Sequence, residues 1–81
     1  MVRCKFRCTE KITREMGYWD SAKQATVMTV VYGYQFFAVT EGSEENKAFF
    51  ASTPNGKLEV GAVRGDLFQP GKEYYLDFSE A

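Results

Sequence analysis

The sequence predicts a mainly β protein, a small antiparallel sheet or OB-like barrel of four or five strands with one short helix at about residues 43–52. Three observations predict this class. The run at 25–40 is apolar on both of its period-two faces, the segments at 2–9, 57–63 and 73–78 alternate apolar and polar residues, and only the stretch after Ser43 begins like a helix. With 81 residues, the chain is predicted to be one domain, 1–81.

Composition and charge are those of an ordinary globular domain. Charged residues make up 26% of the chain and the net charge is −1, divided between +3 in residues 1–40 and −4 in residues 41–81. The longest apolar run is shorter than a membrane-spanning helix, and the N-terminus lacks the continuous apolar stretch of a signal peptide. We therefore expect no membrane association and a cytosolic location.

The first strand begins the sheet. Val2, Cys4, Phe6 and Cys8 alternate with polar residues and are predicted to face the core, which leaves a basic stripe of Arg3, Lys5 and Arg7 outside. This stripe fits either contact with a phosphate backbone or a solvated edge strand. The two cysteines would stand about 13 Å apart on one strand. They are therefore predicted to be reduced, buried and without a metal, because the chain has no histidine.

Residues 10–23 carry a weaker pattern. Ile12 fits a continuation of the first strand, whereas the segment at 16–21 is predicted to be a connection. Trp19 is the only tryptophan and follows Tyr18. Two interpretations stay open for it: an exposed stacking platform for a base or nucleotide, or a cap folded over one end of the core.

The run at 25–40 is predicted to be the centre of the fold. Because neither of its faces is polar, we expect protein to cover it on both sides. Gly33 marks either a bend in one long strand or a tight turn between two strands. Two strands would give five in all, with the helix in the position that it has in an OB-fold.

The helix and the last two strands follow. Ser43 is predicted to be the N-cap, Glu44 and Glu45 fill the first turn, and Pro54 ends the helix. Asn46 occupies the position of an incomplete capping box, and Phe49 and Phe50 are expected to anchor the helix to the sheet.

Charge predicts how the first and last strands are arranged. The strand at 73–78 has an acidic outer face. We therefore expect it beside the first strand, with Arg3, Lys5 or Arg7 opposite Glu73 or Asp77.

The sequence predicts no catalytic residue, cofactor or metal site. Glu44 and Glu45 diverge on the helix surface and lie at a solvated terminus, where nothing raises a carboxyl pKa. Arg64-Gly65-Asp66 matches the integrin-binding tripeptide, but three residues recur by chance and nothing suggests secretion. We therefore expect a binding protein rather than an enzyme.

A resemblance narrows the context. The motifs SEENKAFF at 43–50, TPNG at 53–56 and FQPGKEYYLDF at 68–78 resemble those of a group of small, uncharacterised proteins of tailed bacteriophages and prophages. The likeness covers roughly the C-terminal half of the chain. It implies a phage origin and action in the cytoplasm of the infected bacterium, and it brings no catalytic residues.

Three hypotheses of function follow. In the first, the chain is a phage accessory protein that blocks a host factor, for instance a defence protein, or sequesters a nucleotide signal. In the second, it is an OB-like binder of single-stranded nucleic acid, and in the third, a structural or assembly protein that forms a homo-oligomer through a sheet edge. The candidate ligand-binding side chains are Arg3, Arg7, Tyr18, Trp19 and Arg64.

Overall fold

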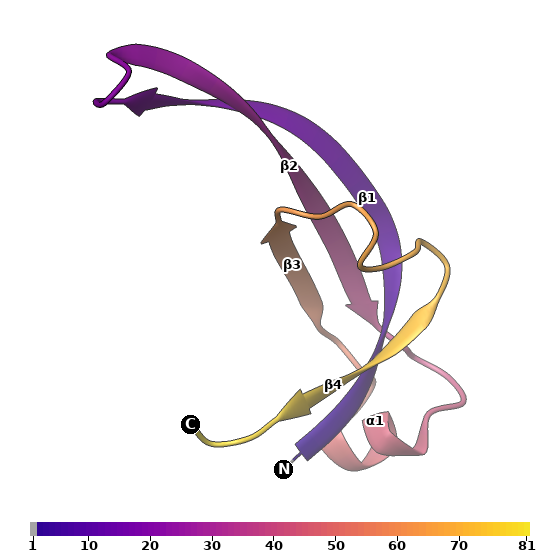
Figure 1. The fold of residues 1–81 in the computed structure, drawn as a ribbon. Coiled ribbons are helices and arrows are strands. Elements are labelled where there is room, and N and C mark those ends of the chain that lie inside the picture. Colours follow the sequence, from indigo (N-terminus) through magenta and orange to yellow (C-terminus); the bar gives the residue numbers. More distant parts are fainter. Residues whose placement is uncertain (1) are drawn as a thin grey trace.

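One open antiparallel sheet makes up most of the molecule (Figure 1). The computed structural model describes residues 2–81, with β1 (Val2–Asp20), β2 (Ala25–Ala38), α1 (Glu44–Phe49), β3 (Lys57–Ala62) and β4 (Glu73–Phe78) in chain order. The strand order is β3-β2-β1-β4, with β3 and β4 at the two edges. The predicted mainly β class is therefore confirmed with four strands, and the predicted closed barrel is wrong.

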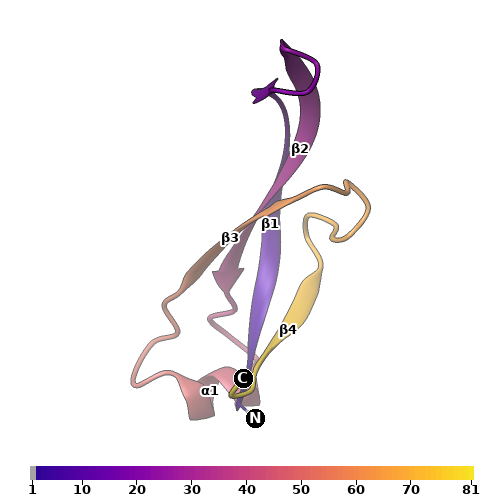
Figure 2. The same cartoon turned by 60° about the vertical axis from the view of Figure 1, so that its left-hand side comes forward.

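The sheet divides into two regions because its strands differ in length. β3 pairs with β2 only over Tyr32–Phe37, and β4 pairs with β1 only over Val2–Arg7. Beyond β3, residues 14–31 continue as a two-stranded ribbon that we call the arm, and we call the remainder the body. Figures 1 and 2 both show the arm projecting away from β3, β4 and α1. The molecule is accordingly elongated, 52 Å along its longest axis.

The hydrophobic core belongs to the body and lies on one face of its sheet. Five buried side chains form it: Cys4, Phe6, Cys8, Tyr34 and Phe36. The connection between β3 and β4 crosses this face and contributes Phe68, whose ring meets that of Phe36 edge to face with centroids 5.0 Å apart. The same connection accepts a hydrogen bond of 2.8 Å from the Tyr34 hydroxyl at the carbonyl of Arg64. Aromatic edge contacts thus close one side of an otherwise open sheet.

The two cysteines lie inside this core. Cys4 and Cys8 are free thiols with no exposed surface, so the predicted unbridged, buried state is confirmed. Burial raises the pKa of the Cys4 thiol, which keeps it protonated and unreactive at neutral pH.

Charge pairs join β1 to β4 as predicted. Arg3 lies opposite Asp77 in the register and donates to its carboxylate at 2.7 Å, and Arg7 lies opposite Glu73 at 2.6 Å. Lys5 stands 3.9 Å from Glu73. These pairs are partly exposed and contribute at most about 1 kcal/mol each, so they favour this register more than they hold the fold.

The helix is shorter than predicted. Ser43 is its N-cap, as expected, and its hydroxyl accepts a 3.2 Å hydrogen bond from the amide of Asn46. The helix ends at Phe49, well before Pro54, because Phe50 already has extended backbone angles. Phe50 packs against the core, whereas Phe49 is 41% exposed and stacks on Phe78.

Asn46 attaches the helix to the sheet, a role that its capping position did not suggest. Its side chain accepts from the amide of Lys5 at 2.6 Å and donates to the carbonyls of Lys5 and Val39, both at 2.8 Å. Beyond the end of β2, the Val39 amide still donates to the Lys5 carbonyl at 3.1 Å, and the Asn46 side chain bridges the other two groups of this pair, the Lys5 amide and the Val39 carbonyl. Asn46 is completely buried, and these two bonds satisfy backbone groups that would otherwise lack a partner.

The predicted enclosure of residues 25–40 is wrong. Only Tyr34, Phe36 and Val39 of this run are buried, and the part that belongs to the arm is open to solvent. The run forms one strand up to Ala38 without a turn at Gly33, so the five-strand alternative is also wrong. The bulge lies in β1 instead, between Cys8 and Glu10.

The segment at 16–21 is strand rather than connection. β1 continues to Asp20, and the chain turns back only over residues 21–24. Trp19 is 65% exposed at the far end of the arm, so it does not cap the core. The part of the sequence with the weakest pattern is therefore half of the arm.

Candidate functional site

The arm is a regular hairpin whose turn is fixed by Asp20. Its carboxylate accepts hydrogen bonds from the amides of Ala22 at 3.0 Å and Lys23 at 3.2 Å, and Gln24 takes a left-handed backbone conformation with φ of 50°. An aspartate that binds amides two and three residues ahead favours a tight reversal of the chain. The pairing then runs without a shift from Asp20 and Ala25 down to Arg14 and Val31.

Both faces of the arm carry exposed apolar side chains. One face continues the core face and holds Trp19, Met28 and Val30, and the outer face holds Met16 and Tyr18. The exposed fractions on the core-side face are 65% for Trp19, 59% for Met28 and 41% for Val30, and those on the outer face are 54% for Met16 and 50% for Tyr18. Within residues 2–81, no other strand pairs with the arm, and its ribbon projects away from β3, β4 and α1 (Figures 1 and 2), so these groups stay exposed.

The two long edges of the arm differ in charge. On β1, the segment at 14–20 carries Arg14, Glu15 and Asp20. On β2, the segment at 25–31 reads ATVMTVV and has no charge and no proline. Charged side chains discourage a further strand from pairing with an edge, and an uncharged β-branched edge invites it. Only the β2 edge of the arm therefore has the character of a strand-pairing surface.

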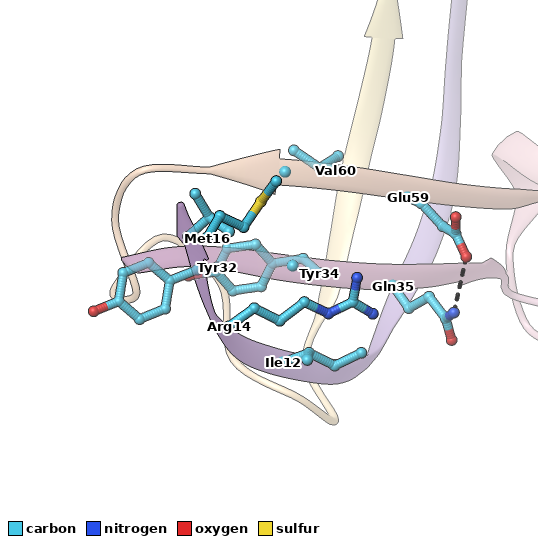
Figure 3. Close-up of a pocket in the computed structure, with 11 residues that line it drawn as sticks. Ile12, Arg14, Met16, Tyr32, Tyr34, Gln35, Glu59 and Val60 are labelled. Carbon is cyan, nitrogen blue, oxygen red and sulfur yellow. Dashed lines mark hydrogen bonds between the residues drawn. The ribbon is translucent and has the colours of Figure 1, made fainter. Parts of the chain in front are cut away.

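A shallow trough lies at the base of the arm on the outer face (Figure 3). Gly33 and Gly61 are opposite each other in β2 and β3 and leave its floor without side chains. Its volume is about 280 Å³, and Ile12, Met16 and Val31 contribute apolar walls. Figure 3 shows Arg14 reaching along the trough toward Gln35.

Charge within the trough is unevenly compensated. Glu59 accepts hydrogen bonds at 2.9 Å from both Lys57 and Gln35, and these bonds, that of Lys57 foremost, lower the pKa of its carboxyl group. Arg14 forms no ion pair or side-chain hydrogen bond within the part of the chain that the structure describes. Its guanidinium therefore makes no direct contact with a carboxylate, although its charge also helps to lower the pKa of the Glu59 carboxyl group.

The residues predicted to bind a ligand lie in three separate places. Arg3 and Arg7 are beside β4 and engaged by carboxylates, whereas Trp19 is about 40 Å of strand farther along β1 than Arg7. Arg64 follows β3 and pairs with Asp66 at 3.0 Å. The hydrogen bond from Arg64, together with the positive charge of Arg64, lowers the pKa of the Asp66 carboxyl group. One chain therefore does not bring these five side chains together.

Tyr18 and Trp19 do not form a shared stacking platform. As neighbours in one strand they point to opposite faces, and each pairs with a different row of β2, Tyr18 with Val27 and Trp19 with Thr26. Both are exposed, so each can contact a partner on its own face.

Met16, Met28 and Val30 complete the exposed apolar surface and were not predicted as site residues. Their signal is present in the sequence, since the apolar run at 25–31 has no polar face. A strand covered by its own chain and a strand covered by another molecule have the same pattern, and a single sequence does not separate them.

Comparisons with protein-family models, with curated protein sequences and with solved structures found no match for this chain. Within residues 2–81, no cluster of three or more acidic or cysteine side chains is arranged to hold a metal ion. Over the same range, no helix has the length and apolar character needed to cross a bilayer.

Proposed function

We propose that this chain is a binding protein without catalytic activity and that the arm is its binding element. One observation carries the proposal: five large apolar side chains, each between 41% and 65% exposed, stand on a ribbon that the rest of the chain leaves uncovered. Contiguous exposed apolar surface in a small protein is typical of interaction sites. A two-stranded ribbon is also only marginally stable by itself, so a partner that covers the arm would stabilise it.

The chemistry of the arm favours a protein partner with an apolar surface. Tyr and Trp supply large contact area with little loss of conformational freedom, and methionine adapts to irregular surfaces. Tyr18 and Trp19 at the tip, with Met16 and Met28 behind them, supply both properties. Charged side chains are few on these faces, which is the composition of the centre of a protein interface.

Binding of single-stranded nucleic acid receives less support. Such binding needs cations that follow the phosphate backbone close to the stacking aromatic groups. Arg3 and Arg7 are engaged by Asp77 and Glu73, far from Trp19.

Sequestration of a nucleotide signal is a second candidate, favoured by Arg14. Its unpaired guanidinium beside the open trough provides a cation for a phosphate, and the glycine floor leaves room for a flat ring. Equilibrium dialysis of wild type and Arg14→Gln against a panel of nucleotides tests this candidate. Uptake by wild type that the variant loses supports it, and no uptake by either protein removes it.

The resemblance to phage proteins supplies the setting of the proposal. In this setting, the arm of a phage accessory protein contacts a host protein, for instance a defence factor, in the cytoplasm of the infected bacterium. Occupation of an apolar surface on that factor by the arm would block its normal contacts.

Site-specific photo-crosslinking tests the proposal in infected cells. A photoreactive phenylalanine analogue replaces Tyr18 in one tagged variant and Tyr75 in a control variant. The two tyrosines are equally exposed, 50% and 52%, but Tyr75 lies on β4 in the body. We expect one host-protein adduct from position 18 and none from position 75.

Competition makes the experiment specific to the arm. Excess untagged wild-type protein is expected to suppress the adduct, whereas an untagged Met16→Thr/Trp19→Thr variant is not. Equal adducts from both positions, or competition by both proteins, would refute the proposal. Adducts with nucleic acid that weaken steeply with added salt would favour the nucleic-acid hypothesis instead.

A further inference from the structure

The uncharged edge of β2 is a surface that neither the fold nor the proposed host contact uses. Over Ala25–Val31, β2 has β1 on one side and no strand on the other, because β3 ends at Ala62 opposite Tyr32. Alternate residues of this stretch therefore direct backbone amide and carbonyl groups outward, where only water can satisfy them. The opposite edge of the arm, on β1, is the one that carries charges.

We propose that this edge pairs with the same edge of a second copy of the chain, which makes a two-fold symmetric dimer with a continuous β1-β2-β2-β1 sheet through the two arms. A two-fold interface uses the same surface on both chains, so the surface must be complementary to itself. The sequence ATVMTVV at 25–31 meets this condition, since no register brings like charges together.

Geometry selects one register. A two-fold axis perpendicular to the sheet keeps each side chain on the same face of the joined sheet in both copies. Because side chains alternate between faces along a strand, paired residues must differ in residue number by an even number. The register centred on Met28 pairs Val27 with Thr29 and Thr26 with Val30 of the other copy. It places the symmetry axis at the middle of the free edge, whereas neighbouring registers use less of that edge.

The body of each copy leaves room for this register. β3 and the incoming β2 would occupy the same row beside β2, end to end, because both run antiparallel to it. Ala62 is opposite Tyr32, and Thr26 of the other copy would be opposite Val30. The position opposite Val31 stays between them, and there Val63 leaves the row of β3 while Ala25 of the other copy enters it. Pairing over residues 26–30 therefore does not overlap β3.

The pairing also extends the apolar faces of the arm. On the core side, the two Met28 side chains would meet at the symmetry axis, because Met28 pairs with itself in this register. Val30 of one copy would lie beside Thr26 of the other, next to Trp19. The dimer would thus present one broader apolar face, which remains available to the partner proposed above, although the dimer does not depend on that partner.

Charge exchange at position 28 tests the dimer and its register. Sedimentation equilibrium across a dilution series is expected to give wild type a mass of two chains of 9.2 kDa, which falls toward one chain on dilution. Met28→Lys and Met28→Glu each place two like charges at the axis and should weaken the dimer about tenfold or more. An equimolar mixture of the two variants should form the dimer again, because opposite charges then meet.

Position 16 provides the matched control. Met16 is 54% exposed, close to the 59% of Met28, but it lies on β1 and away from the axis. Met16→Lys and Met16→Glu are expected to dimerise like wild type. A monomeric wild type at all concentrations, a Met28→Lys protein that dimerises like wild type, or a mixture that stays monomeric would overturn the inference. Because the assay contains no host protein, its result is independent of the crosslinking experiment.

Discussion

The body and the arm share the strands β1 and β2, but apolar side chains of these strands are buried in the body and exposed in the arm. In the body, β1 and β2 turn Phe6, Tyr34 and Phe36 toward a core that the connection carrying Phe68 covers. In the arm, the same strands hold Trp19 and Met28 in water. The two regions differ in which elements lie beside them rather than in composition, because β3, β4 and α1 all lie beside the body.

This difference indicates that the two regions have different roles. The body has its own core, a capped helix and charge pairs in register, so it holds the fold. The arm carries apolar surface that adds little to folding and is available to another molecule.

The largest expected contrast is between a core and an arm aromatic residue. Phe36→Ala removes a ring that is 3% exposed and packed against Phe68, and should lower the free energy of unfolding by about 3–5 kcal/mol. Tyr18→Ala removes a half-exposed ring and should cost about 0.5 kcal/mol or less. Urea denaturation of both variants measures the contrast. Similar losses would mean that the arm belongs to the folding core.

A smaller effect is expected at the junction of helix and sheet. Asn46→Ala leaves the amide of Lys5 and the carbonyl of Val39 without their partner and removes one of the two hydrogen bonds to the carbonyl of Lys5, and should cost about 2–4 kcal/mol. Ser43→Ala removes the cap and the hydrogen bond that the hydroxyl donates to the Glu45 carboxylate, and should cost about 1 kcal/mol. Thermal unfolding of the two variants ranks them. A loss for Ser43→Ala as large as that for Asn46→Ala would contradict the role given to Asn46.

The smallest expected effect is a change in how the stability of the fold depends on acidic pH. The hydrogen bond from Arg3, together with its charge, lowers the pKa of the Asp77 carboxyl in the folded state. A carboxyl with a lowered pKa stabilises the fold above its ordinary pKa and loses that contribution as the pH falls through the folded value, below about pH 4.

Stability measured from neutral to acidic pH tests this contribution. Asp77→Asn and Arg3→Gln should each give a shallower loss of stability in acid than wild type, and the double variant should resemble either single variant. A wild-type acid profile in Asp77→Asn would show that the β1–β4 pair contributes nothing.

Sequence patterns predicted the body well for physical reasons. Alternation in residues 2–8 and 57–62 reflects one covered face, and the structure covers that face except at Val2, which is 51% exposed at the start of β1 because little of the chain lies beside it there. Opposite charge on the outer faces of β1 and β4 predicted that they are neighbours, since Arg3 and Asp77 are aligned by the register that buries Cys4. The Ser43 cap was predictable because it depends only on local sequence.

The arm and the junction at Asn46 were not predictable in the same way. An apolar run without a polar face indicates cover on both sides but does not say whose chain supplies it, so residues 25–31 were assigned to the interior. The bonds between Asn46 and Lys5 join positions 41 residues apart, which no local pattern encodes. The chemistry of the predicted binding residues says nothing of their positions, and only the continuation of β1 to Asp20 shows that Trp19 lies far along the strand from Arg7.

The central claim, that the arm is not required by the fold and is free to bind, is tested most directly by removing its apolar character. A variant with Met16, Tyr18, Trp19, Met28 and Val30 all changed to threonine keeps strand propensity on the arm. Measured on monomeric protein, its free energy of unfolding should fall by less than that of the single Phe36→Ala variant. An equal or larger loss, or failure to fold, would contradict the account, because the arm would then be part of what holds the protein together.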